Sequence, residues 1–138
     1  MAALESKPLK IAYAEGVTLD WNHGELEEGL ACYRRGKFFL AHEHWESVWL
    51  TLEHPEKTFL QAMIQVTVAF HHLNAGNSTG ALSLLRRAFR RLEQFPAHFG
   101  EIDLALLRAE ISDWMLAVER GSSQLPASYP QVLPLGHD

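Results

Sequence analysis

Residues 36–49 read GKFFLAHEHWESVW, a stretch rich in aromatic residues, histidine and glutamate. A helix turns by about 100° per residue, so large apolar side chains at helical spacing fall on one face. That face would carry Phe38, Ala41, Trp45, Trp49 and Leu52. The stretch therefore predicts an amphipathic helix whose aromatic side turns toward a core and brings His42 with it.

Prolines and glycines divide the rest of the chain into further helical segments. Pro55 and Pro96 both fall where the apolar periodicity breaks, as expected between helices. We predict helices over 23–35, 37–53, 56–75, 78–95 and 101–120, and no sheet. Short connections make neighbouring helices antiparallel, so the expected fold class is all-α: one compact bundle of about five helices built from antiparallel helical hairpins.

Two of the predicted helices begin alike. Gly36 and Ala41 correspond to Gly76 and Ala81 at an offset of 40 residues. This spacing indicates a helical hairpin used twice, and it loosely resembles the second helix of a tetratricopeptide repeat, whose period is shorter, about 34 residues. A tetratricopeptide-like binding module without enzymatic activity, with its function in a groove between hairpins, is therefore one hypothesis.

The chain of 138 residues is long enough for one core. We expect an N-terminal segment at 1–18, a helical domain at 19–121 and an extended tail at 122–138. Prolines at 126, 130 and 134 prevent the tail from continuing as a helix. Whether the tail packs on the bundle or projects freely stays open at this point.

The formal net charge of −5 disfavours general attraction to nucleic acid or to an anionic membrane. No apolar stretch reaches the roughly 20 residues of a membrane span. Cys32 is the single cysteine, which precludes an internal disulfide and is typical of the reducing cytoplasm. We therefore expect a cytoplasmic protein that binds a small molecule or a peptide, with a homo-oligomer left open.

The predicted helix at 56–75 is apolar almost all round, which indicates a central buried helix. Its exceptions Gln61, Gln65 and His72 lie within about 40° of one another around the axis. On the preceding helix, His42 and Glu46 are one turn apart. An unpaired buried polar group costs about 1–3 kcal/mol, so we predict that the two polar lines meet in one connected cluster.

The chemistry of such a cluster has three interpretations. Two imidazoles and a carboxylate, from His42, His72 and Glu46, would suit a divalent metal such as zinc, iron or manganese. A histidine and a glutamate within reach could instead act as acid and base without a metal. The third interpretation is a buried hydrogen-bond network that fixes the register of the helices.

The same residues carry a family resemblance. An aromatic residue followed by Ala-His-Glu-x-x-Glu-x-x-Trp stands here as Phe38, Ala41, His42, Glu43, Glu46 and Trp49. A glutamine-rich helix ending in His-Leu-x-x-Gly-Asn and Gly-Ala follows as Gln61, Gln65, His72, Leu73, Gly76, Asn77, Gly80 and Ala81. Over roughly residues 22–95 the chain resembles the small all-helical family called domain of unknown function 309.

Members of that family are sometimes described as predicted metal-dependent hydrolases, so the resemblance implies a candidate metal-dependent hydrolase. It adds Glu43 to His42 and Glu46 as candidate catalytic residues. The expected metal ligands are then His42, Glu46 and His72, and the expected substrate contacts are Gln61, Gln65 and Trp49. For the core, we predict that Trp45, Trp49, Ile64, Val68, Leu85 and Phe89 pack together.

Overall fold

The computed structural model describes residues 19–132 and 134. Within them the chain forms five helices and one short hairpin of two strands, in the order α2 (Gly24–Arg34), α3 (Phe38–Trp49), α4 (Glu56–Asn74), α5 (Ser78–Leu92), β1 (His98–Phe99), β2 (Ile102–Asp103) and α6 (Leu104–Glu119). All five predicted helices are present, with ends that differ by a few residues. The all-α fold class is confirmed, and the predicted segment 1–18 lies outside the described residues.

The turns of the two helical hairpins are copies of each other. Gly36 and Gly76 have φ angles of 77° and 87°, in the left-handed region that glycine adopts without strain. In each turn, the residue after the glycine donates its backbone N–H to the carbonyl four residues before the glycine, at 2.8 Å. Ala41 and Ala81 are then fully buried at equivalent positions. The hairpin used twice is therefore confirmed as a structural repeat.

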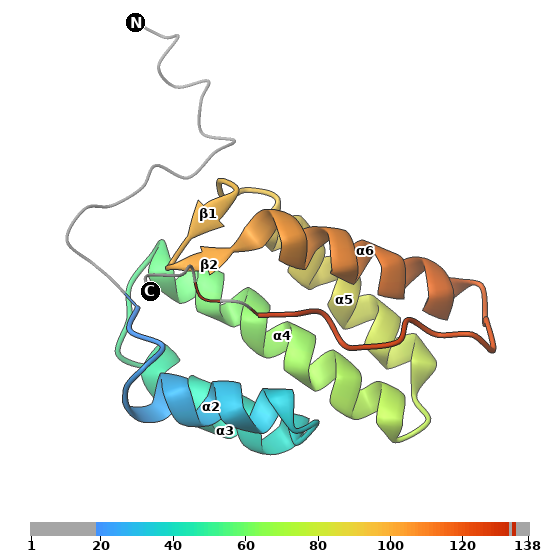
Figure 1. Ribbon diagram of the computed structural model, residues 1–138, viewed down its shortest axis with the longest axis horizontal. Helices are drawn as coiled ribbons and strands as arrows, with labels where there is room; N and C mark the ends of the chain where they lie inside the picture. Colours follow the sequence, from blue (N-terminus) through green and yellow to red (C-terminus); the bar gives the residue numbers. More distant parts are fainter. Residues whose placement is uncertain (1–18, 133, 135–138) are drawn as a thin grey trace, which may run out of the picture.

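The helices form two hairpins, α2 with α3 and α4 with α5, and α6 packs against α5 (Figure 1). Helix α2 approaches α3 closely because Gly29 has no side chain. A Cβ atom at Gly29 would lie 2.3 Å from Nε1 of Trp45. The Trp45 side chain is fully buried, and its indole N–H donates to the Leu26 carbonyl at 3.2 Å. This contact fixes the first hairpin.

The predicted core is confirmed in part. Trp45 and Leu85 are fully buried, and three of the others are partly buried side chains packed against the core: Trp49, Ile64 and Phe89. The prediction was wrong for Val68, which is only half-buried and is not among the residues packed on the core. Val68 belongs to a stripe of α4 that is half-buried along its length, at positions 61, 64, 65, 68 and 72. Helix α4 is therefore not buried on all sides.

A β-hairpin at 98–103 corrects the prediction that no sheet would form. Phe99 and Ile102 pair across a turn in which Gly100 and Glu101 both have positive φ angles, of 60° and 66°. Each strand has only two residues, too few for an alternating pattern to be visible in the sequence. The Gly100 carbonyl accepts a hydrogen bond from the Trp21 indole at 2.7 Å, which attaches the hairpin to the start of the helical domain.

Candidate functional site

His42 and Glu46 lie one turn apart on α3, as predicted. The His42 Nε2 atom is 3.6 Å from Oε1 of Glu46, and the two side chains are 21% and 53% exposed. Glu43 is exposed on the outer side of α3. His44 turns toward α2, where its Nδ1 atom is 2.5 Å from Oε1 of Glu25. The pair thus sits at the edge of the bundle, open to solvent through its carboxylate.

The predicted connection between the pair and the polar line of α4 is not made by hydrogen bonds. Gln65 accepts instead from Nε of Arg91 on α5, at 3.2 Å. Across the described residues, no hydrogen bond joins His42 or Glu46 to Gln65 or His72. The prediction assumed that the polar line was buried, whereas it lies on the half-buried stripe of α4. Solvent can satisfy side chains there, so no partner on α3 is needed.

His71, which the sequence analysis did not include, is the histidine that lies near α3. The Phe39 ring centroid is 5.4 Å from the ring of His42 and also 5.4 Å from the ring of His71. Phe39 is half exposed. These three rings form a surface patch where α3 meets the end of α4. A helical wheel gives the direction of the His71 side chain around the axis of α4. It does not show which side of α4 faces α3.

The expected metal ligands do not form a metal-binding group. In the part of the chain that the structure describes, no group of three or more histidine, cysteine, aspartate or glutamate side chains could hold a metal ion. His42, Glu46 and His72 are therefore not assembled as a ligand set. Two side-chain atoms at the motif, Nδ1 of His42 and Nε1 of Trp49, are buried without a hydrogen-bond partner. The Lys57 ammonium lies over the Trp49 ring, 4.3 Å from its centroid.

A second candidate site is formed by the C-terminal tail. Residues 121–132 form neither helix nor strand, and the tail runs back along α4 between α2 and α6 (Figure 1). Pro134 then pairs with Ile102 of the β-hairpin. The described residues of the tail, up to 132 and at 134, therefore pack on the bundle, which answers the question left open by the sequence. We call the surface of α2, α4 and α6 that carries residues 128–132 the tail groove.

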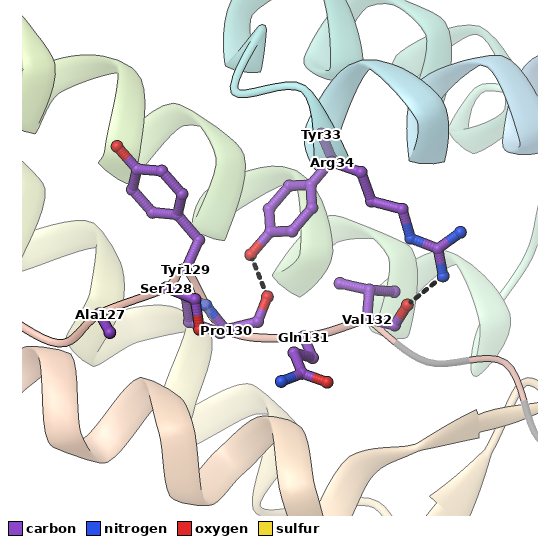
Figure 2. Close-up of a pocket in the computed structure, with 8 residues that line it drawn as sticks. All are labelled: Tyr33, Arg34, Ala127, Ser128, Tyr129, Pro130, Gln131 and Val132. Carbon is purple, nitrogen blue, oxygen red and sulfur yellow. Dashed lines mark hydrogen bonds between the residues drawn. The ribbon is translucent and has the colours of Figure 1, made fainter.

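Side chains of the tail groove donate hydrogen bonds to three alternate carbonyls of the tail. The Trp114 indole N–H donates to the Ser128 carbonyl at 3.0 Å. Figure 2 shows the other two: the Tyr33 hydroxyl donates to the Pro130 carbonyl at 2.6 Å, and the Arg34 guanidinium donates to the Val132 carbonyl at 3.0 Å. The backbone N–H of residue 131 donates in turn to Oε1 of Glu110 at 2.7 Å. Residues 128, 130, 131 and 132 are therefore each held through a backbone atom.

The Tyr129 side chain enters a set of aromatic rings between these anchors. It stacks on Trp114 with a centroid distance of 5.3 Å and an interplanar angle of 8°. Phe38 and Phe70 make edge-to-face contacts with the Tyr129 ring, at centroid distances of 4.8 and 4.9 Å. The Tyr129 hydroxyl reaches Oδ1 of Asn74 at 3.4 Å. Ring pairs of this kind add about 0.5–1.5 kcal/mol each beyond their buried area.

Tyr33 links the tail to the core. Burial raises the pKa of its hydroxyl, and the negative charge of Glu110 raises the pKa further. The hydroxyl therefore stays protonated and remains a donor at ordinary pH. Beside it, a cavity of about 480 Å³ is lined by Tyr33, Arg34 and residues 127–132 (Figure 2). The tail thus leaves open space in the groove next to its own backbone.

The fold and these sites define an all-α protein of paired helical hairpins whose C-terminal segment lies across the helices and is hydrogen-bonded to them. Residues 26–84 match the sequence model of a protein family, which is described as a domain of unknown function (DUF309). The resemblance inferred from the sequence is thereby confirmed across α2, α3, α4 and the first part of α5. Trp114 and Tyr129 lie beyond the matched residues.

A curated relative, described as an uncharacterized protein from Aquifex aeolicus (strain VF5), is 26% identical to this chain over 98 residues. The match covers 70% of this chain and 29% of the relative, so the chain spans less than a third of the length of that protein. Neither comparison names an activity.

Proposed function

We propose that this protein is a helical binding module whose tail groove holds an extended protein segment. The observation that carries the proposal is the set of donors from Trp114, Tyr33 and Arg34, which reach three alternate backbone carbonyls. Backbone carbonyls are present in every sequence, so these donors recognise an extended chain as such. Specific side-chain contacts can then be added between them, as in other modes of recognition of extended peptides.

The repeat supports this interpretation. Arg34 of the first hairpin and Asn74 of the second occupy equivalent positions at the 40-residue offset, in the last turns of α2 and α4. Both contact the tail: Arg34 through the Val132 carbonyl and Asn74 through the Tyr129 hydroxyl. Repeated helical hairpins bind ligands along a shared surface to which each repeat contributes equivalent residues. The tail groove has this character.

Metal-dependent hydrolysis at the α3 motif is the alternative, and it derives from the family resemblance. The His42–Glu46 pair supplies one imidazole and one carboxylate, but the third expected ligand, His72, is not assembled with them. Three protein ligands are usual at a catalytic zinc. We therefore rank binding ahead of hydrolysis. Gln61, Gln65 and Trp49 are kept as proposed contacts of a ligand that would bind between α3 and α4. Glu43 is kept as a proposed contact at the solvent-exposed edge of that site.

Among the described residues, no helix combines the length and the apolar character needed to cross a bilayer. A cytoplasmic location and a homo-oligomer are kept as parts of the proposal.

The experiment uses the full chain with Tyr129→Ala, which removes the central anchor of its own tail. A fluorescent peptide with the sequence of residues 124–134, QLPASYPQVLP, is titrated with this variant. We expect saturable binding, measured by fluorescence anisotropy. The matched control carries Trp114→Phe as well, which keeps an aromatic ring but removes the donor to the Ser128 carbonyl, and should bind about tenfold more weakly.

Circular dichroism and thermal unfolding show whether each variant remains helical. A folded Tyr129→Ala chain that fails to bind the peptide would overturn the proposal. Equal binding with and without Trp114→Phe would place the peptide elsewhere on the surface and would also overturn it.

A further inference from the structure

We infer that the tail groove selects segments in which an aromatic residue is followed by proline, then by any residue, then by an aliphatic residue, and that the tail is a built-in competitor for such segments. This inference rests on the proposed binding function and names the class of ligand. In the tail itself, the four positions are Tyr129, Pro130, Gln131 and Val132.

The first position requires an aromatic ring. The Tyr129 ring is in contact with Trp114, Phe38 and Phe70, and an aliphatic side chain would lose both the stacked and the edge-to-face geometry. Tyrosine is favoured over phenylalanine only slightly, because its hydroxyl makes a long, exposed bond of 3.4 Å to Asn74.

The second position favours proline. Pro130 is buried, and its carbonyl accepts a hydrogen bond from the Tyr33 hydroxyl. Proline has no backbone N–H, so no donor is buried there without a partner. Its ring also restricts φ to a value compatible with extended backbone, which lowers the entropy lost when the segment is ordered.

The third and fourth positions differ in how much of their side chains the groove contacts. The Gln131 side chain is exposed, and only its backbone N–H is used, by Glu110. The Val132 side chain is 3% exposed and belongs to the core cluster. Any side chain should therefore be accepted at the third position, whereas a polar side chain at the fourth would be buried without a partner.

The tail occupies the groove as an intramolecular ligand. Residues 123–127, which lie between α6 and the bound part of the tail, make no hydrogen bond to the described helices; within them, Gln124 bonds to Ser122. A segment tethered by a short connection competes with a free segment at a high effective concentration. A free segment then binds with an apparent Kd equal to the intrinsic Kd divided by the fraction of chains with an open groove. Weakening the tail should therefore strengthen binding of a separate segment.

The test compares the wild-type chain with the Tyr129→Ala chain, using the peptide of residues 124–134. We expect the variant to bind at least about tenfold more tightly than the wild type, because its groove is open more often. A second chain variant, Val132→Asn, weakens the tail at a different anchor and should give the same direction. It serves as the test if Tyr129→Ala does not fold.

Four peptides, each with one substitution, then examine the ligand class on the variant chain. Tyr129→Ala and Val132→Asn in the peptide should each weaken binding by about tenfold or more, and Pro130→Ala by a smaller factor. Gln131→Ala should leave the Kd within about twofold.

Equal binding of all four peptides would overturn the proposed ligand class while leaving the binding function intact. Equal binding of the unsubstituted peptide to the wild-type and variant chains would overturn the role of the tail as a competitor. Absence of binding by every peptide to both folded chain variants would overturn the binding function itself.

Discussion

The hydroxyl of Tyr33 joins residues that are 97 positions apart in the sequence, and its removal tests how firmly the tail is held. Tyr33→Phe preserves the ring, which stacks on Trp45 at 6.1 Å and meets the edge of Phe38 at 5.3 Å. The substitution deletes a buried hydrogen bond of 2.6 Å and leaves the Pro130 carbonyl without its donor. The packing of the core is otherwise unchanged.

The expected loss follows from these two effects. A typical hydrogen bond contributes about 0.5–1.5 kcal/mol net, and a buried acceptor left unpaired costs about 1–3 kcal/mol. Since the released tail can expose that carbonyl to water, we expect the lower part of the range, about 1–2 kcal/mol. Urea unfolding measures the global change, and the rate of tryptic cleavage after the exposed Arg120 reports local release of the tail.

Tyr129→Phe is the matched control, because it removes a tyrosine hydroxyl whose bond to Asn74 is long and exposed. Its cost should be below about 0.5 kcal/mol. If Tyr33→Phe cost no more than Tyr129→Phe and left the cleavage rate unchanged, the hydroxyl of Tyr33 would not hold the tail, and the reasoning would fail.

The raised pKa of Tyr33 adds a dependence on pH. Near pH 10 and above, the unfolded chain releases the tyrosine proton while the folded chain retains it, so folding stability falls as the pH rises. This contribution is fully present below about pH 10. The Tyr33→Phe chain should therefore lose less stability than the wild type between about pH 8 and about pH 11. Parallel losses in the two proteins would show that Tyr33 does not carry the effect.

Three further predictions concern α2, α3 and the motif. Gly29→Ala should destabilise the chain by about 1–3 kcal/mol through its clash with Trp45, and Trp45→Phe in the same chain should relieve part of that loss in a double-mutant cycle of urea unfolding. Trp49→Ala should cost less than the roughly 3–5 kcal/mol of a fully buried tryptophan, because Trp49 is only partly buried; a loss within that range would contradict its position. Glu46→Gln and His42→Ala should leave the zinc, iron and manganese content of chelator-free protein unchanged, and stoichiometric metal in the wild type that both variants lose would favour the hydrolase instead.

Much of the fold could be predicted because its signals are local. Pro55 ends one helical pattern, and Gly36 and Gly76 close two identical turns, so the helices and their hairpin order follow from nearby residues. The β-hairpin at 98–103 could not be predicted, because two positive φ angles in succession, one of them at Glu101, are not a sequence pattern.

The candidate sites depended on long-range packing, which the sequence defines poorly. The helical wheel placed Gln65 correctly on the polar line of α4, but Arg91 of α5 is its partner. The contact between the rings of Phe39 and His71 could not be predicted for the same reason, since a helical wheel gives the direction of a side chain but not the neighbour that it meets. The tail groove combines Tyr33 with residues almost a hundred positions later. The available signals were Tyr129, an aromatic residue beside proline, and the apolar Val132 three positions further on.

The central claim is that the tail groove binds an extended segment, and the indole N–H signal of Trp114 tests it most directly. The chain has four tryptophans, and comparison with the Trp114→Phe protein assigns this signal in a proton–nitrogen spectrum. On titration of the Tyr129→Ala chain with the peptide of residues 124–134, we predict that the Trp114 signal shifts saturably. The Trp45 indole, which is bonded to the Leu26 carbonyl in the core, should stay in place. A Trp114 signal that does not respond to the peptide would contradict the account.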